Sequence, residues 1–187
     1  MACCGLRPSG KASFGDGEQF VNFTTENGLA SNDVLVIYRG SDDVIWFGRS
    51  RGVSRFDGQK FVTPVSQSGL AEDFVYTIYE DPEVGMWFGT REGGIFRYHE
   101  DGVINFTTED GLPHNRVRSI RRDLDGRMWF GTAAGVSRYN GDSFANFTTE
   151  NGVKDGLYSM ERVTGWINWA KQDSKKRWLR GGLQKTG

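Results

Sequence analysis

The sequence predicts an all-β fold of repeated four-stranded sheets, because one tripeptide recurs at a nearly constant interval. Trp-Phe-Gly occurs three times in the 187 residues, at steps of 41 and 42 residues. A period of roughly 40–45 residues is typical of propeller blades. No segment has a sustained apolar period of 3.6 residues, so we expect almost no helix. The Trp and Gly of the three copies are Trp46 and Gly48, Trp87 and Gly89, and Trp129 and Gly131.

Each unit begins with Gly-Leu and continues into a first strand, which we name strand A. A Val follows the Leu by five residues, as Val34 does, and an Ile follows three residues later, as Ile37 does. Residues three apart on a regular strand point to opposite faces. We therefore expect strand A to be apolar on both faces and to be covered on both by neighbouring blades.

Three further strands complete the unit. Trp-Phe-Gly lies on strand B, and residues such as 53–56, Val-Ser-Arg-Phe, form strand C. The following Asp57-Gly58 is a strong hairpin signal. An aromatic strand D, seen at residues 144–148, closes the unit. The pattern predicts four short antiparallel strands joined by tight turns.

These residues resemble the two-component regulator propeller repeat, whose unit runs Gly-Leu, Val-x-x-Ile, an acidic-Gly turn, Trp-Phe-Gly-Thr and Gly-Val-x-Arg-Tyr. Residues 111–139 match it almost completely and residues 69–98 match well, whereas residues 28–56 have Arg49 in place of Thr. The resemblance covers about residues 12–152. It implies a β-propeller of the kind that commonly forms the extracytoplasmic sensor region of membrane-bound histidine kinases.

The chain divides into three parts by these patterns. We expect a disordered tail at 1–11, propeller blades at 12–152 with repeats near 28–68, 69–110 and 111–152, and a degenerate fourth blade with a basic tail at 153–187. In the last part, Trp166 and Trp169 take the places of Val and Ile, and Trp178 follows Trp169 by nine residues, as the strand B Trp follows Ile.

The two ends of the chain together supply one more blade. Residues 12–14 are expected to be a worn strand C and residues 20–24 a strand D, while strands A and B come from the C-terminal part. A closed four-bladed ring is one arrangement, at the low end of propeller sizes. Two chains that join as a homodimer are the second, and a truncated, open partial propeller is the third.

Composition excludes some classes of function. The net charge of −1 argues against a nucleic-acid or membrane-surface binder, which needs a basic excess. No apolar run of 18 residues is present, so we expect no membrane span in this chain. Residues 1–11 lack the apolar region of a signal peptide, which predicts a cytoplasmic chain if it is expressed as given. The resemblance instead implies a periplasmic or extracellular location.

The sequence contains no recognisable catalytic arrangement. Its two histidines, His99 and His114, lie in no local Ser/His/Asp or Cys/His pattern. The acidic turns lack the ligand set of a calcium loop, and the adjacent Cys3 and Cys4 have no His nearby. We therefore expect no catalytic residue, no metal site and no cofactor.

Positions that differ between the blades are the better candidates for a ligand site, because positions identical in every blade are needed for each blade to fold. In usual propeller geometry the D-to-A and B-to-C loops share one face. There, and on the inner strand, the blades differ in charged residues, which predicts a cationic mouth for a carboxylate, a sulfate or an acidic sugar. The candidate ligand-binding residues are Arg49, Arg51, Arg91, Glu92, His114 and Arg118.

These patterns favour a non-catalytic binding module for an oligosaccharide or another polar ligand. The alternative is a protein–protein interaction scaffold, since propellers offer a broad rigid face and a fold does not fix a function. A third class is an enzyme similar to the streptogramin lyases, which would need a metal-dependent His/Glu site in the central face. Only His114 falls near that face.

Overall fold

The computed structural model describes residues 3–6, 12–15, 20–29, 31–63, 69–99 and 102–151. Strands and one-turn 3-10 helices make up the regular structure of these residues, which confirms the predicted all-β fold. None of these helices has the length and apolar character needed to cross a membrane. The predicted degenerate blade at 153–187, with Trp178, lies outside the described residues.

Three four-stranded antiparallel sheets form the blades, each a meander in which consecutive strands pair. Blade 1 contains β4 (Val34–Arg39), β5 (Ile45–Arg49), β6 (Val53–Phe56) and β7 (Phe61–Val62). Blade 2 contains β8 (Val75–Asp81), β9 (Gly85–Thr90), β10 (Ile95–His99) and β11 (Gly102–Phe106). Blade 3 contains β12 (Val117–Arg122), β13 (Met128–Thr132), β14 (Gly135–Tyr139) and β15 (Phe144–Phe147).

A one-turn helix lies beside each blade connection and explains the Gly-Leu at the start of the repeat. In η1 (Thr25–Asn27) and η3 (Thr108–Asp110), a preceding threonine caps the turn, and a glycine ends it in the left-handed region. These glycines, Gly28 and Gly111, have φ of 96° and 100°, which only glycine adopts readily. The other two turns are η2 (Gly69–Glu72) and η4 (Thr149–Asn151).

A three-stranded sheet precedes blade 1. It contains β1 (Cys3–Leu6), β2 (Ala12–Gly15) and β3 (Phe20–Phe23) in that order. Strands β2 and β3 occupy the segments that we expected to be strands C and D. Strand β1 contacts β4 as β5 contacts β8, so β1 corresponds to a strand B. Residues 3–6 are therefore a strand, where the sequence predicted a disordered tail.

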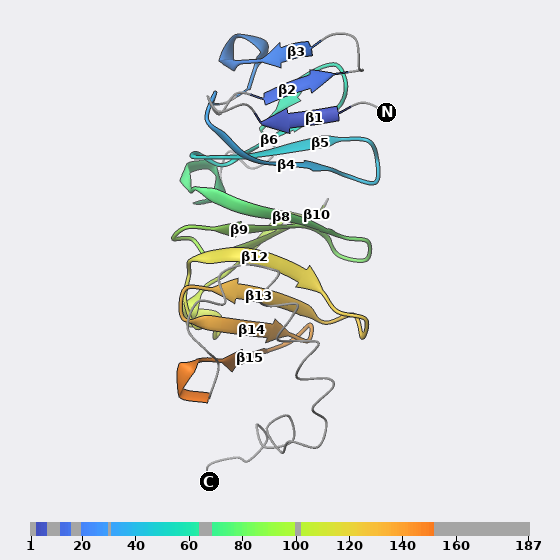
Figure 1. Ribbon diagram of the computed structural model, residues 1–187. Helices are drawn as coiled ribbons and strands as arrows, with labels where there is room; N and C mark the ends of the chain where they lie inside the picture. Colours follow the sequence, from blue (N-terminus) through green and yellow to red (C-terminus); the bar gives the residue numbers. More distant parts are fainter. Residues whose placement is uncertain are drawn as a thin grey trace.

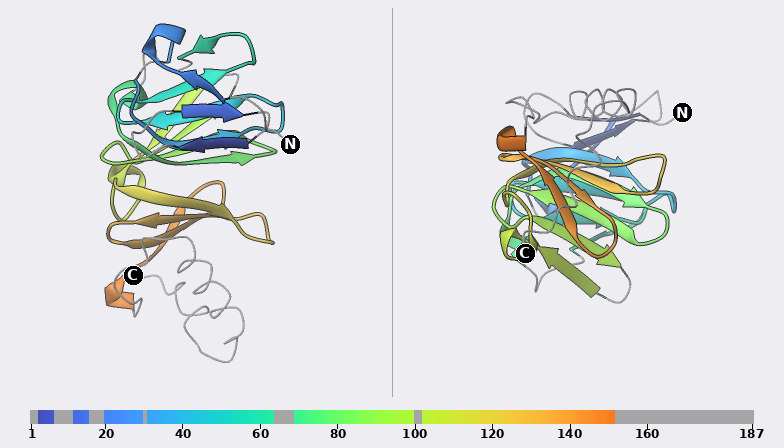
Figure 2. Two further views of the ribbon diagram at one scale, coloured as in Figure 1. Left: turned by 45° about the horizontal axis from the view of Figure 1, so that its top comes forward. Right: turned by 90° about the horizontal axis from the view of Figure 1, so that it is seen from below.

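The four sheets lie in an open row (Figure 1). The sheet of β1–β3 is at one end, the sheet of β12–β15 is at the other, and β4, β8 and β12 contact one another in sequence. The right-hand view of Figure 2 looks along this row from the β15 end. The described residues thus form a partial propeller, and the closure of a ring by the C-terminal segment lies outside them.

A β-bulge changes the faces of strand A from those we expected. In β8 the register shifts between Val75 and Thr77, so Val75 pairs with Thr90 and Ile78 pairs with Phe88. Thr90 and Phe88 are two residues apart on β9 and share a face, which puts Val75 and Ile78 on the same face as well. Equivalent bulges occur in β4 and β12. The prediction of opposite faces was wrong because the bulge inserts one extra residue.

The Trp-Phe-Gly motif joins one blade to the next. Trp and Phe are adjacent on strand B and point to opposite faces, so the Trp of one blade meets the Phe of the following blade. The ring centroids of Trp46 and Phe88 are 5.5 Å apart, and those of Trp87 and Phe130 are 5.6 Å apart. All four side chains are buried. These aromatic pairs form the core between blades.

The glycine of the motif allows the next strand A to approach closely. A Cβ atom on Gly89 would lie 2.6 Å from Thr77 Cγ2 in its own blade and 2.9 Å from the carbonyl oxygen of Val117 in blade 3. At Gly48, the same atom would lie 2.9 Å from Val75 Cγ1 in blade 2. A side chain at either position would separate the blades.

We predict that Gly89→Ala lowers the free energy of unfolding by about 1–3 kcal/mol, because the methyl group overpacks the interface between blades 2 and 3. Urea denaturation measures the change. Gly69→Ala is the matched control, since a Cβ there would meet only Phe96 Cζ at 3.8 Å, an ordinary contact. Equal stability of both variants would contradict the proposed close approach.

Candidate ligand-binding site

The D-to-A and B-to-C loops lie along the same face of the row, as expected. The backbone N–H of Gly52, in the B-to-C loop of blade 1, donates to the carbonyl oxygen of Asp73, just before blade 2, at 2.8 Å. The N–H of Gly94 donates to the carbonyl oxygen of Asn115 in the same way, at 3.0 Å. The B-to-C loops of blades 1 and 2 are therefore tied to the connection that enters the next blade.

Two of the predicted cationic residues flank a pair of aromatic rings on this face. The guanidinium of Arg91 lies over the ring of Phe74, 6.0 Å from its centroid. Phe74 and Tyr76 have centroids 5.3 Å apart, and Arg118 of blade 3 lies over Tyr76 at 5.8 Å. Arg91 and Arg118 are exposed, and both rings are half-buried. We name these four residues the loop-end cluster.

The β-bulge explains why Arg118 and Tyr76 meet. Tyr76 and Arg118 are the extra residues of the bulges in β8 and β12, and Leu35 holds this position in β4. A bulge redirects a side chain out of the ladder. The sequence showed that this position varies between blades, but the bulge and the role of Phe74 were not predicted.

Of the other predicted residues in these loops, Glu92 contacts the cluster, whereas Arg51 and His114 have no described contact with it. Arg51 and His114 are exposed, and Nδ1 of His114 accepts a hydrogen bond from the N–H of Arg116 at 2.8 Å. Glu92 is exposed, and its carboxylate lies 3.5 Å from Nε of Arg91. Glu92 therefore partly balances the charge of the cluster.

Arg49 does not lie at the mouth that we expected. Its side chain is 1% exposed, and its Nε and Nη1 atoms have no hydrogen-bond partner. Burial lowers the pKa of Arg49 to about 10. The equivalent Thr90 and Thr132 donate their hydroxyls to loop carbonyl oxygens at 3.0 Å. Arg49 thus replaces a satisfied hydroxyl with a buried guanidinium, two of whose nitrogen atoms have no hydrogen-bond partner.

We predict that Arg49→Met raises the free energy of unfolding by about 1–3 kcal/mol near neutral pH, because it keeps an unbranched, flexible stem and removes the buried charge. Arg49→Lys, which keeps a charge, should give no such gain. Since the folded-state pKa is lowered to about 10, the cost is full below that pH and falls as the pH rises from there toward the ordinary pKa of an arginine in the unfolded chain. Denaturation midpoints of the three proteins test this; a destabilised Arg49→Met would refute it.

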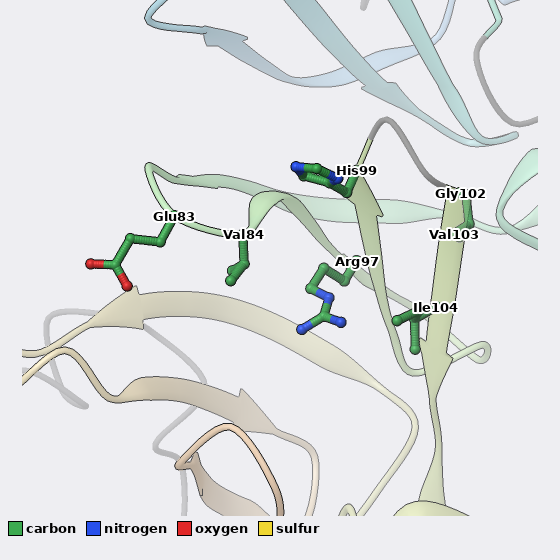
Figure 3. A pocket seen from close by; sticks show the side chains of 7 residues that line it. All are labelled: Glu83, Val84, Arg97, His99, Gly102, Val103 and Ile104. Atoms are coloured by element: carbon green, nitrogen blue, oxygen red, sulfur yellow. The ribbon is translucent and has the colours of Figure 1, made fainter.

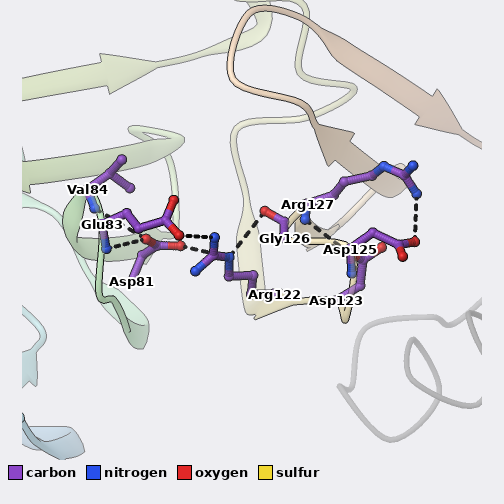
Figure 4. A network of polar contacts seen from close by, with 8 residues as sticks. All are labelled: Asp81, Glu83, Val84, Arg122, Asp123, Asp125, Gly126 and Arg127. Atoms are coloured by element: carbon purple, nitrogen blue, oxygen red, sulfur yellow. Dashed lines mark hydrogen bonds and ion pairs between the residues drawn. The ribbon is translucent and has the colours of Figure 1, made fainter.

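The opposite face of the row, where the A-to-B loops lie, carries ion pairs between blades 2 and 3 (Figure 4). Nη2 of Arg122 in β12 lies 2.9 Å from a carboxylate oxygen of Glu83, and Nε lies 3.4 Å from Asp81. Nε also donates to the carbonyl oxygen of Gly126 at 3.2 Å. The hydrogen bond with Glu83 raises the pKa of Arg122. One arginine therefore holds the A-to-B loop of the preceding blade.

Two adjoining hollows open beside these ion pairs, of about 340 and 380 Å³. Glu83, Val84 and Arg97 line both of them. Figure 3 shows the first hollow, with Arg97 directed between Val84 and Ile104. These hollows could not be predicted from the sequence, because Arg97 occupies a position that is Arg in every repeat.

That repeated arginine covers the Trp of its own blade. Arg97 lies 5.6 Å from the ring centroid of Trp87 and 5.9 Å from that of Phe106. Arg138 lies over Trp129 at 5.7 Å in the same manner. These cation–π contacts explain the Arg of the strand C motif structurally. Among the described residues no group of three potential metal-ligating side chains converges.

The fold and the arrangement of loops define the class of protein: the chain forms part of a β-propeller. Residues 111–134 match the profile of the two component regulator propeller family. These residues are thus a repeat of that family, which confirms the resemblance at the unit that fits its pattern best. A comparison with curated protein sequences gives no match.

Solved structures with this fold include extracellular domains of two-component systems. The extracellular domain of BT3049 from B. thetaiotaomicron, described as a hybrid two component system, is 28% identical, with a TM-score of 0.61. The match covers 81% of this chain and 22% of the BT3049 chain. The BT4673 domain from the same organism is 26% identical, with a TM-score of 0.63. This match covers 75% of this chain and 20% of the BT4673 chain. The chain therefore spans about a fifth of the length of these domains.

An enzyme also has this fold. Virginiamycin B lyase from Staphylococcus aureus is 16% identical, with a TM-score of 0.60, over 78% of this chain and 54% of its own. At this identity the likeness extends to the fold alone. The extracellular domains are the more similar in sequence.

Proposed function

We propose that this chain is part of the extracellular, ligand-sensing propeller of a two-component system and that it binds a ligand without transforming it. The observation that carries the proposal is the 28% identity to such an extracellular domain over 81% of the chain. The proposal includes an extracytoplasmic location. Transmission of a signal would belong to a longer protein, since the chain spans about a fifth of the similar domains.

The loop-end cluster is the proposed ligand site. Its two guanidinium groups, from Arg91 and Arg118, lie on either side of the rings of Phe74 and Tyr76. A guanidinium binds carboxylate or sulfate groups through paired N–H donors, and an aromatic ring packs against the C–H face of a sugar ring. We therefore propose an acidic saccharide as the ligand class. Glu92 beside Arg91 offers an acceptor for a hydroxyl group.

Arg51 and His114 extend the same proposed surface toward the neighbouring loops, and both are exposed. Arg49 is left out of the proposed site because its guanidinium is buried. The cationic mouth predicted from the sequence is thus retained in a smaller form. It is centred on the interface between blades 2 and 3.

We predict that Arg91→Ala combined with Arg118→Ala weakens binding to acidic glycans by at least about tenfold, because both charge-assisted contacts are lost. An array of acidic and neutral glycans, followed by calorimetry on the best binder, measures the effect. The matched control, Arg39→Ala with Lys60→Ala, removes two exposed cations on the opposite face of the row. An equal loss in the control would show a general charge effect and contradict the site.

The same array separates the alternative functions. Binding of no glycan by the folded chain would contradict the saccharide proposal and favour the protein-interaction scaffold. The homodimer predicted from the sequence remains a prediction, and the native mass in solution tests it.

A further inference from the structure

The blades satisfy the donors of their Trp and Arg side chains differently at the A-to-B loop end. In blade 3, Nε1 of Trp129 donates to a carboxylate oxygen of Asp123 at 2.9 Å. The equivalent pair in blade 2 is Trp87 and Asp81. There Asp81 is instead 3.4 Å from Arg122 of blade 3, and the buried Nε1 of Trp87 has no acceptor.

A second carboxylate is drawn away in the same manner. In blade 1, Asp42 lies 3.8 Å from the guanidinium of Arg55 in its own blade. The equivalent residues in blade 2 are Glu83 and Arg97. Glu83 pairs with Arg122 at 2.9 Å, and the described contacts of Arg97 are with the rings of Trp87 and Phe106. Arg122 thus leaves two donors of blade 2 without an acid of their own.

The two adjoining hollows between blades 2 and 3 form one groove, which Arg97 lines in both hollows and Trp87 in the second, with its Nε1 atom buried. In Figure 3, Arg97 points between the apolar side chains of Val84 and Ile104, and the carboxylate of Glu83 points away from it. Ile104 is 46% exposed, which is high for a large apolar side chain. The groove therefore combines a guanidinium that has no described acid partner with apolar walls, and the carboxylates of Asp81, Glu83 and Asp125 also line it.

We propose that this groove binds a small carboxylate with an aromatic or aliphatic body. The carboxylate would accept hydrogen bonds from the Arg97 guanidinium, which lies over the ring of Trp87. The apolar body would cover Val84 and Ile104, consistent with pockets in which a few polar groups orient a mainly apolar ligand. This site lies on the face of the row opposite the loop-end cluster. It is independent of the function proposed for that cluster.

Blade 3 provides an internal control. Arg138 stacks over Trp129 as Arg97 stacks over Trp87, but the N–H of Trp129 already has Asp123 as its acceptor. Loss of the stacking arginine should therefore cost each blade a similar cation–π contact. Only the loss of Arg97 should remove the ligand site.

The test follows the indole N–H resonances of the six tryptophans in the ¹⁵N-labelled chain. Trp87→Phe assigns the resonance of Trp87. Phenylacetate is titrated as the probe, and phenylacetamide, its neutral amide, is the matched comparison. We expect phenylacetate to shift the Trp87 resonance saturably and phenylacetamide to leave it in place. Arg97→Gln should weaken phenylacetate binding by about tenfold or more, whereas Arg138→Gln should leave it unchanged.

Three results would overturn the proposal. A Trp87 resonance that does not respond to phenylacetate up to its solubility limit would show that the groove is no site. An equal response to phenylacetamide would show that the carboxylate is not recognised. Unchanged binding in Arg97→Gln would show that the anion contacts other residues. The dispersed resonances of the remaining tryptophans report in each variant that the chain is folded.

Discussion

The contact between the Trp of one blade and the Phe of the next is the interaction on which the rest of the structure depends. Trp46 meets Phe88, and Trp87 meets Phe130, across interfaces where a glycine lets the following strand A approach. Because Trp and Phe are neighbours on one strand, each blade presents one ring to either side. The contact therefore repeats along the row, and it sets the spacing that brings the loops of adjacent blades together.

The repeat pattern was sufficient to predict the blades and their order, because these follow from local spacing. The bulge in strand A was not predictable, since its extra residue is Leu35, Tyr76 or Arg118 and has no common chemistry. The burial of Arg49 was also missed, because residue type alone suggests a solvated charge whereas burial depends on the neighbouring sheet. The groove beside Arg97 depends on Arg122, which belongs to another blade and crosses the interface only in the folded chain.

The two faces of the row, one with the D-to-A and B-to-C loops and one with the A-to-B loops, carry different chemistry on one scaffold. At the loop end, bulge residues bring Arg118 of one blade over Tyr76 of the blade before it. On the other face, Arg122 forms ion pairs with the acids at the A-to-B loop of the preceding blade. In both places an arginine of blade 3 acts on blade 2. Variation between otherwise equal repeats thus has its largest effect at the interface between them, where a substitution in one blade changes the partners available to its neighbour.

The most direct test of this account is a double-mutant cycle on Trp46 and Phe88, each replaced by Leu singly and together. The account predicts a favourable coupling of about 0.5–1.5 kcal/mol in the free energy of unfolding, since the rings touch across the interface between blades. Urea denaturation of the four proteins measures it. Additive effects, with a coupling of about zero, would contradict the claim that this aromatic pair joins the blades.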